Sequence, residues 1–189
     1  MNHPDQTPSP WVQRWSHLVP AGGTVFDVAC GFGRHLRWFK GLNHPVVGVD
    51  RSRDAIDSVA GLGDVVLADI ENGPWPFAGR CFAGIVITNY LWRPLMPLLV
   101  QSVAPGGVLI YETFAAGNET VGKPVRPDFL LRPGELLEAC RELRVIGYED
   151  GFLPLPARFV QRIAAVRPAL PGASVAQPGP PVAYPLAGW

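Results

Sequence analysis

Apolar residues along the chain follow two rhythms, short continuous runs and a recurrence at every third or fourth position. Short apolar runs bounded by glycine, proline or acidic residues predict buried strands, whereas the longer spacing predicts amphipathic helices. The two kinds of segment alternate up to residue 143, which is the order of parallel strands joined by helices. The expected strands are residues 24–28, 45–50, 64–68, 81–88 and 108–112, and the expected helices are residues 11–18, 34–42, 53–62, 92–103 and 133–143, the last with Pro133 in its first position.

Two more apolar runs, residues 143–148 and 159–166, follow each other without a helical segment between them. Strands that are consecutive in sequence pair readily as an antiparallel hairpin. We therefore expect an α/β fold with a doubly wound, mostly parallel seven-stranded sheet and a C-terminal antiparallel hairpin. In this interpretation residues 22–166 form the domain, residues 1–21 form a loose lead with a short helix, and the Pro- and Gly-rich residues 167–189 form a flexible tail or an arm packed over the surface.

The first expected strand leads into the stretch V-F-D-V-A-C-G-F-G, residues 25–33. A strand, a glycine-rich turn and a helix form the layout of a nucleotide-binding unit, in which the backbone approaches a ligand at the helix N-terminus. The dinucleotide pattern G-x-G-x-x-G would need a third glycine where Leu36 stands. A carboxylate at Asp27 would also repel a pyrophosphate, whereas it suits a ligand that carries an ammonium and a sulfonium group.

Acidic residues accompany the first three expected strands: Asp27 lies within the first, Asp50 ends the second and Asp69 follows the third. Each of them alone is also explained as the cap of a turn or helix. The carboxyl ends of parallel strands, however, meet in the crevice where such sheets bind ligands. Three acids at that edge favour a ligand site.

With these acids placed, residues 22–166 resemble the class I (Rossmann-like) S-adenosylmethionine-dependent methyltransferases. The glycine motif of that family is an acid followed by small residues and glycines at every second position, and the family carries further acids after its second and third strands. Its sheet also closes with a hairpin. The matching residues here are Asp27, Ala29, Gly31 and Gly33, with Ala29 in place of a glycine, followed by Asp50 and Asp69.

The resemblance implies S-adenosylmethionine as cofactor. It places Asp27 near the amino-acid end of the cofactor, directly or through water, and Asp50 at the ribose hydroxyls. It places Asp69 at the adenine amino group with the Ile70 backbone beside it, and either Arg51 or Ser52 over one adenine face. The full set expected at the cofactor is Asp27, Ala29, Cys30, Gly31, Gly33, Arg34, Asp50, Arg51, Asp69, Ile70 and Asn89.

Methyl transfer from a sulfonium is an in-line displacement with a good leaving group, so positioning and desolvation can supply much of the catalysis. In the resembling family the end of the fourth strand lies close to the transferred methyl, which makes Asn89 and Tyr90 the candidate catalytic residues. Tyr90 is equally explained by packing. The family members that methylate base amines often carry Asn/Asp-Pro-Pro-aromatic at this point, but here Leu91 and Trp92 follow. We therefore expect a small-molecule acceptor.

The segment 113–132 is long for a connection in a compact domain, and connections of that length are usually functional or disordered. It and the short N-terminal helix are the two segments expected to serve as a lid over a site. The cations Arg93, Lys123, Arg126 and Arg132 either favour an anionic acceptor or are solvated charges offset by neighbouring acids.

Composition narrows the alternatives. The 189 residues are 48% hydrophobic, enough for one sizeable core, and the 16 basic and 16 acidic residues leave no basic excess for a nucleic-acid surface. The three cysteines are widely spaced and fit no metal pattern, which is typical of free thiols in a cytoplasmic protein. We expect no signal peptide or membrane span, and a monomer or homodimer. An RNA or protein methyltransferase and a non-catalytic S-adenosylmethionine-binding protein remain as alternatives.

Overall fold

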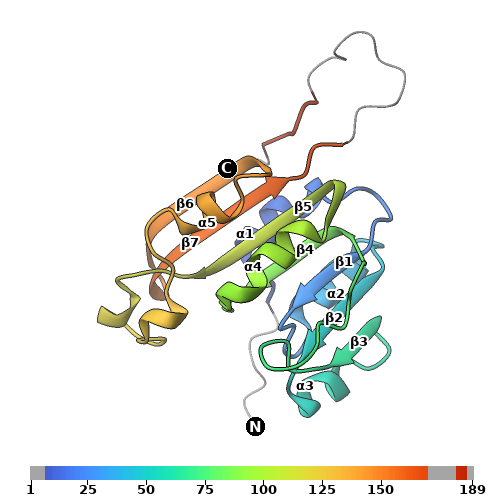
Figure 1. Ribbon diagram of the computed structural model, residues 1–189, viewed down its shortest axis with the longest axis horizontal. Coiled ribbons are helices and arrows are strands. Elements are labelled where there is room, and N and C mark those ends of the chain that lie inside the picture. Colours follow the sequence, from blue (N-terminus) through green and yellow to red (C-terminus); the bar gives the residue numbers. More distant parts are fainter. Residues whose placement is uncertain (1–6, 170–181, 187–189) are drawn as a thin grey trace.

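The computed structural model describes residues 7–169 and 182–186, and a single seven-stranded sheet forms its centre (Figure 1). The strands lie in the order β3-β2-β1-β4-β5-β7-β6. Strands β1 to β5 run parallel, and β7 is antiparallel to both of its neighbours. The expected doubly wound sheet with a closing hairpin is therefore confirmed. The strands are β1 (Val25–Val28), β2 (Val46–Asp50), β3 (Asp64–Leu67), β4 (Phe82–Thr88), β5 (Val103–Phe114), β6 (Arg144–Pro154) and β7 (Ala157–Val166).

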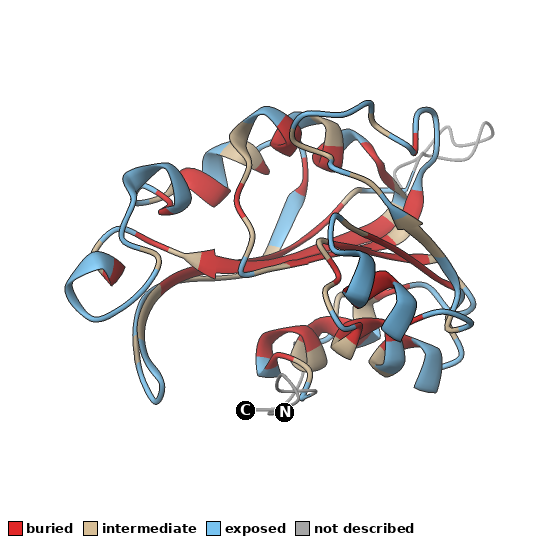
Figure 2. Ribbon diagram, turned by 90° about the horizontal axis from the view of Figure 1, so that it is seen from below, coloured by how far each residue is buried: buried red, intermediate tan, exposed pale blue. Residues whose placement is uncertain are grey.

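Helices cover both faces of the sheet, which is seen nearly edge-on between them in Figure 2. One face is covered by α1 (Pro10–Trp15), α2 (Arg34–Gly41) and α3 (Arg53–Ser58), and the other by α4 (Met96–Gln101) and α5 (Glu135–Ala139). Apolar side chains of the first three helices pack with Val25 and Ile110, and those of α4 and α5 pack with Phe26 and Leu109. Short 3-10 turns are η1 (Ser16–Leu18), η2 (Arg93–Leu95), η3 (Asn118–Thr120) and η4 (Pro127–Phe129).

Several helices are shorter than the apolar pattern predicts, and glycine explains two of the ends. Helix α3 stops at Ser58, before Gly61 with a φ of 81°. Helix α5 begins at Glu135, because Gly134 occupies the position before it with a φ of 74°. Pro133 therefore precedes the helix instead of starting it, and that detail of the sequence interpretation was wrong. Left-handed backbone of this kind favours glycine and interrupts a helix.

Helix α1 belongs to the core and is not a lid. Its Trp11 and Trp15 side chains are 2% and 1% exposed, and their rings meet edge to face with centroids 5.6 Å apart. The guanidinium of Arg162 in β7 lies 5.0 Å from the centre of the Trp11 ring. Burial of two tryptophans and their cation–π contacts fixes the helix on the sheet. Of the two segments that could have covered a site, only the loop after β5 remains.

The described part of the C-terminal segment lies against the domain. Arg167 donates to the carbonyl oxygens of Val100 and Val103, both at 2.8 Å. Further on, the Tyr184 ring lies under the Arg144 guanidinium at 5.1 Å. The expectation for residues 170–181 and 187–189 falls outside the described residues. Within the described chain, every helix is too short or too polar to cross a bilayer.

Candidate functional site

Two neighbouring cavities open at the carboxyl ends of the parallel strands. Cavity A has a volume of about 330 Å³ and cavity B about 390 Å³, and both are lined by Ala29, Asn89 and Tyr90. Cavity A extends along the ends of β2, β3 and β5, whereas cavity B lies over the turn between β1 and α2. The other residues that line cavity A are Val49, Asp50, Arg51, Ala68, Asp69, Ile70, Glu71, Leu91, Thr113, Phe114, Pro124 and Phe129. Those that line cavity B are Asp27, Cys30, Gly31, Phe32, Arg34, His35 and Thr88.

Cavity B is lined by the carboxylate of Asp27 and by the guanidinium of Arg34. Asp27 is 2% exposed, and its Oδ2 atom has no hydrogen-bond partner among the described residues. Arg34 donates to Thr88 Oγ1 at 3.3 Å, which holds its guanidinium at the cavity. A buried carboxylate oxygen without a partner is unfavourable unless a ligand or water donates to it. The pair of opposite charges can therefore receive a zwitterion.

The turn itself offers backbone and no reactive side chain. A Cβ added at Gly31 would meet no atom within 4 Å, so this residue leaves open space at the cavity wall. Burial raises the pKa of the Cys30 thiol, and the charges of Asp27 and Asp50 raise it further. The thiol therefore stays protonated at neutral pH and is a poor nucleophile.

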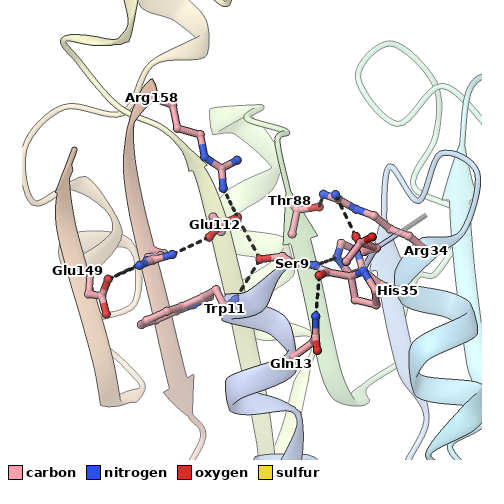
Figure 3. Close-up of polar contacts among 12 residues, drawn as sticks. Ser9, Trp11, Gln13, Arg34, His35, Thr88, Glu112, Glu149 and Arg158 are labelled. Carbon is pink, nitrogen blue, oxygen red and sulfur yellow. Dashed lines mark hydrogen bonds and ion pairs between the residues drawn. The ribbon is translucent and has the colours of Figure 1, made fainter. Parts of the chain in front are cut away.

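A buried polar chain connects the N-terminal segment to cavity B (Figure 3). The Ser9 backbone N–H donates to His35 Nε2 at 3.2 Å, and the Ser9 hydroxyl donates to Glu112 Oε1 at 3.1 Å. Because Nε2 accepts, the proton of the neutral ring sits on Nδ1, which lies 3.8 Å from Asp27 Oδ1. Glu112 is 1% exposed and is also paired with Arg158 at 3.6 Å and Arg162 at 3.2 Å. Ser9 thus fixes the ring that stands behind Asp27.

Two substitutions at Ser9 separate its two contacts. Ser9→Ala removes only the hydroxyl, which also caps α1 by accepting from the Trp11 N–H, and should destabilise the fold by about 1 kcal/mol. Ser9→Pro also removes the N–H, and the Ser9 φ of −54° accommodates the proline ring. Leaving His35 Nε2 buried without a donor should cost roughly 1–2 kcal/mol more. Urea denaturation measures both variants, and equal stabilities would contradict a role for the N–H.

Asp50 closes the turn between the two cavities. Its Oδ2 accepts from the Gly31 N–H at 2.8 Å, and its Oδ1 accepts from the Ser52 N–H at 2.8 Å. The cap of α3 is Ser52, whose hydroxyl accepts from the Ala55 N–H at 3.3 Å. Each carboxylate oxygen has a second lone pair, so Asp50 can still accept from a ligand. Asp50 therefore does not cap helix α3, but it does cap the loop that follows β2, as the capping alternative allowed.

Asp69 closes its own loop, as the capping alternative predicted. It accepts from the N–H groups of Glu71 and Asn72 at 2.9 and 3.2 Å and from the Asn72 side-chain amide at 3.0 Å. These bonds, the Asn72 side chain first, lower the pKa of the exposed Asp69 carboxyl. Asp69 is therefore ionised at neutral pH, and it lines cavity A beside Ile70.

The strands β1 and β4 both end in left-handed residues that are not glycine. Ala29 has a φ of 52° and Asn89 a φ of 54°. Asparagine tolerates this conformation, but alanine is strained in it. Both residues stand where the cavities meet, so the backbone is bent at the centre of the site.

Replacing Ala29 with glycine should therefore stabilise the protein. Ala29→Gly removes the Cβ strain of the left-handed backbone, and we expect the free energy of unfolding to rise by about 1 kcal/mol. Chemical denaturation of the two proteins compares the midpoints directly. A lower midpoint for the variant would mean that Ala29 packing outweighs backbone strain.

Tyr90 is suited to donate a proton in a hydrogen bond and unsuited to act as a base. Burial raises the pKa of its hydroxyl, and the nearby Glu71 carboxylate raises it further. The residue is positioned through its backbone, since the Tyr111 hydroxyl donates to the Tyr90 carbonyl oxygen at 2.9 Å. Burial also raises the pKa of Tyr111, which keeps this donor protonated.

The loop after β5 forms a roof over cavity A with Pro124 and Phe129. Arg93 ties the roof down: it donates to Asp128 O at 2.7 Å, to Leu130 O at 2.8 Å and to both Glu135 oxygens at 2.7 and 3.0 Å. Of the other cations named in the sequence, Arg126 pairs with Asp128 at 2.7 Å and Arg132 with Glu135 at 3.4 Å, whereas Lys123 lines a separate cavity on the loop. These arginines hold the loop together, and neither they nor Arg93 line cavity A.

Ten of the eleven residues expected at the cofactor line one or both cavities. Gly33 lines neither: it precedes α2 with a φ of 75°, and an added Cβ would clash with Val59. The sequence interpretation missed Glu71, Pro124 and Phe129. An apolar residue in an otherwise polar loop was a weak signal for Phe129, whereas Glu71 looked like any exposed acid. Within the described residues, no group of three or more His, Cys, Asp or Glu side chains is placed to hold a metal ion.

No protein-family model and no curated protein sequence matches this chain. Its structure is nevertheless similar to many solved structures. TehB from Haemophilus influenzae has a TM-score of 0.65 at 19% identity, covering 85% of this chain and 62% of TehB, so the chain spans less than two thirds of that protein. A TehB-like S-adenosylmethionine-dependent methyltransferase from Corynebacterium glutamicum has a TM-score of 0.62 at 16% identity, covering 83% of this chain and 86% of its own. The cyclase SpnF has a TM-score of 0.62 at 15% identity, covering 84% of this chain and 78% of SpnF.

Proposed function

The chain therefore has the class I methyltransferase fold, and from that premise we propose that it is an S-adenosylmethionine-dependent methyltransferase that acts on a small molecule. The observation that carries the proposal is the division of charge between the two cavities. Cavity B holds Asp27 and Arg34, and Asp50 and Asp69 line cavity A. Opposite charges at one end and hydrogen-bond acceptors at the other fit a ligand with a zwitterionic amino-acid end and a nucleoside end.

The residues present fit this cofactor in detail. The unpartnered Oδ2 of Asp27 can accept from an ammonium group, and the Arg34 guanidinium can donate to a carboxylate. The free lone pairs of Asp50 suit ribose hydroxyls, as acids at this position do in related folds. The ionised Asp69 and the backbone of Ile70 suit the adenine edge, and Arg51 lies beside them.

When bound, the cofactor supplies an electrophilic methyl group on a sulfonium, which a nucleophile displaces in line. The protein contributes position. Ala29, Asn89 and Tyr90 stand where the cavities meet, so an acceptor in cavity A can face a methyl group presented there. The protonated Tyr90 hydroxyl and the Asn89 amide can orient the acceptor, and the roof residues Pro124 and Phe129 limit water. No side chain has to become an alkoxide or thiolate.

The size of cavity A supports a small acceptor over a macromolecule. The volume of about 330 Å³ under the roof would be shared by the nucleoside end of the cofactor and the acceptor, which leaves room for only a small acceptor. A protein or RNA substrate would have to present a single reactive group through the roof opening.

Transfer of labelled methyl from S-adenosylmethionine to cell extract, followed by size fractionation, tests the function. We expect label in the small-molecule fraction, and Arg34→Ala, which removes the partner for the cofactor carboxylate, should abolish it. Label only in RNA or protein would favour the macromolecular alternative. Cofactor binding without any transfer would overturn the enzymatic proposal.

A further inference from the structure

Cavity A has two sides that differ in character. The sheet order places β2 and β3 on one side of β1, and β4 and β5 on the other. The first side carries Asp50 and Asp69, assigned above to the cofactor. The second side carries no charged side chain: it is lined by Leu91, Thr113, Phe114, Pro124 and Phe129. An uncharged wall with two aromatic rings suits an apolar body.

Glu71 stands at the boundary of these two sides. It follows β3 in sequence, and it lines cavity A together with Tyr90, which follows β4. The Tyr90 hydroxyl is buried and has no hydrogen-bond partner among the described residues. Asp50 and Asp69 accept backbone N–H groups with their carboxylates, and, like both of them, Glu71 forms no ion pair with any residue in the described part of the chain. Its negative charge is therefore free to receive a ligand.

The charge balance of cavity A also favours a cationic ligand. Three carboxylates, those of Asp50, Asp69 and Glu71, line cavity A against the one guanidinium of Arg51. The arginines of the roof are held by acids and carbonyl oxygens outside the cavity. An acidic cavity attracts cations and repels anions, and it does so more strongly where walls exclude water.

We infer that the methyl acceptor is an amine with an apolar body, with its nitrogen beside Glu71 and Tyr90 and its body against the uncharged wall. The inference rests on the proposed function. The Tyr90 hydroxyl can donate to Glu71 and use its own lone pairs to accept from the amine. The bound ammonium form first loses one proton to water. The free amine then forms the N–C bond while the C–S bond breaks and its electron pair stays on sulfur. The positive charge thereby passes from sulfur to nitrogen.

Three ligands that share a phenethyl body and differ in the polar group at its end test this charge preference: phenethylamine, phenethyl alcohol and hydrocinnamate. Their binding is measured calorimetrically on the full chain saturated with S-adenosylhomocysteine. We expect the amine to bind about tenfold tighter than the alcohol, as a charge-assisted hydrogen bond allows, and the carboxylate to bind weakest. Hydrocinnamate binding as tightly as phenethylamine would overturn the inference.

Glu71→Gln keeps the shape of the side chain and removes its charge. It should reduce the affinity for phenethylamine about tenfold and leave the affinity for the alcohol within about twofold. Glu142→Gln is the matched control, because this exposed acid follows α5 and lines a different cavity from cavity A. An amine affinity unchanged by Glu71→Gln contradicts the inference. If the wild-type protein does not bind S-adenosylhomocysteine, the proposed function itself fails, which distinguishes the two failures.

Discussion

Asp50→Ala weakens the binding of S-adenosylmethionine by roughly 10- to 150-fold, the range expected when hydrogen bonds to a charged group are lost. The substitution removes the acceptor for the ribose hydroxyls. It also releases the Gly31 N–H, which Asp50 holds at 2.8 Å, so the turn that separates the cavities loses its brace. Both effects weaken the same equilibrium, which calorimetric titration measures.

Two control variants test whether the loss of affinity in Asp50→Ala is specific to the Asp50 carboxylate. Asp50→Asn keeps one oxygen that can accept from Gly31 and should weaken binding less than alanine does. Asp64→Ala removes a carboxylate from the start of the neighbouring strand β3, where it pairs on the surface with Arg80 at 2.9 Å, and should leave cofactor affinity unchanged. Equal affinities for Asp50→Ala and the wild-type protein would remove Asp50 from the cofactor site.

Arg93→Ala should be the most destabilising of the substitutions considered. Glu135 is 7% exposed and would lose its bidentate partner, while two roof carbonyl oxygens would lose their donor. Breaking a buried ion pair costs about 3–5 kcal/mol, and because the Arg93 side chain is one-third exposed we expect about 2–4 kcal/mol. Denaturant unfolding measures the loss. The exposed pair of Arg126 with Asp128 is the matched control, and Arg126→Ala should cost less than about 1 kcal/mol.

The Arg93–Glu135 pair also predicts a pH dependence. Burial opposes ionisation of Glu135, but hydrogen bonds from Arg93 and the Arg132 N–H outweigh it and lower the pKa of this carboxyl. A lowered folded-state pKa adds stability above the unfolded value, about 4.3 for glutamate, and this stability is lost as pH falls through the folded pKa. The stability difference between wild type and Arg93→Ala should therefore shrink below about pH 4. A difference that stays constant into strong acid would contradict the ion pair.

The sequence predicted the centre of the sheet well because its central strands are buried on both faces. Val46 and Val49 in β2 are 4% and 0% exposed, and such strands appear in sequence as continuous apolar runs. Helix ends were less predictable, because they depend on single glycines such as Gly61 and Gly134 and on packing that no local pattern records. The N-terminal helix was recognised from its spacing, but nothing local indicated that Trp11 would be covered by a strand at the other end of the chain.

The candidate site likewise combines residues that local sequence patterns predict and contacts between distant segments that they do not. Asp27, Asp50 and Asp69, which line the two cavities, could be predicted to lie together because strand spacing places all three at the same edge of the sheet. Contacts between distant segments were not: Ser9 meets His35 across 26 positions and Glu112 across 103. The roof was expected only as a long loop, since the bonds that Arg93 makes to residues 128, 130 and 135 follow from the fold.

Calorimetric titration of the wild-type protein with S-adenosylmethionine and S-adenosylhomocysteine tests the central claim most directly. In the proposed site, both ligands would present the amino-acid end to Asp27 and Arg34 and the nucleoside end to Asp50 and Asp69. We predict saturable one-to-one binding of each, with a dissociation constant of about 1 mM or tighter, within the range usual for enzyme ligands. The absence of binding heat for both ligands at millimolar concentration would contradict the account.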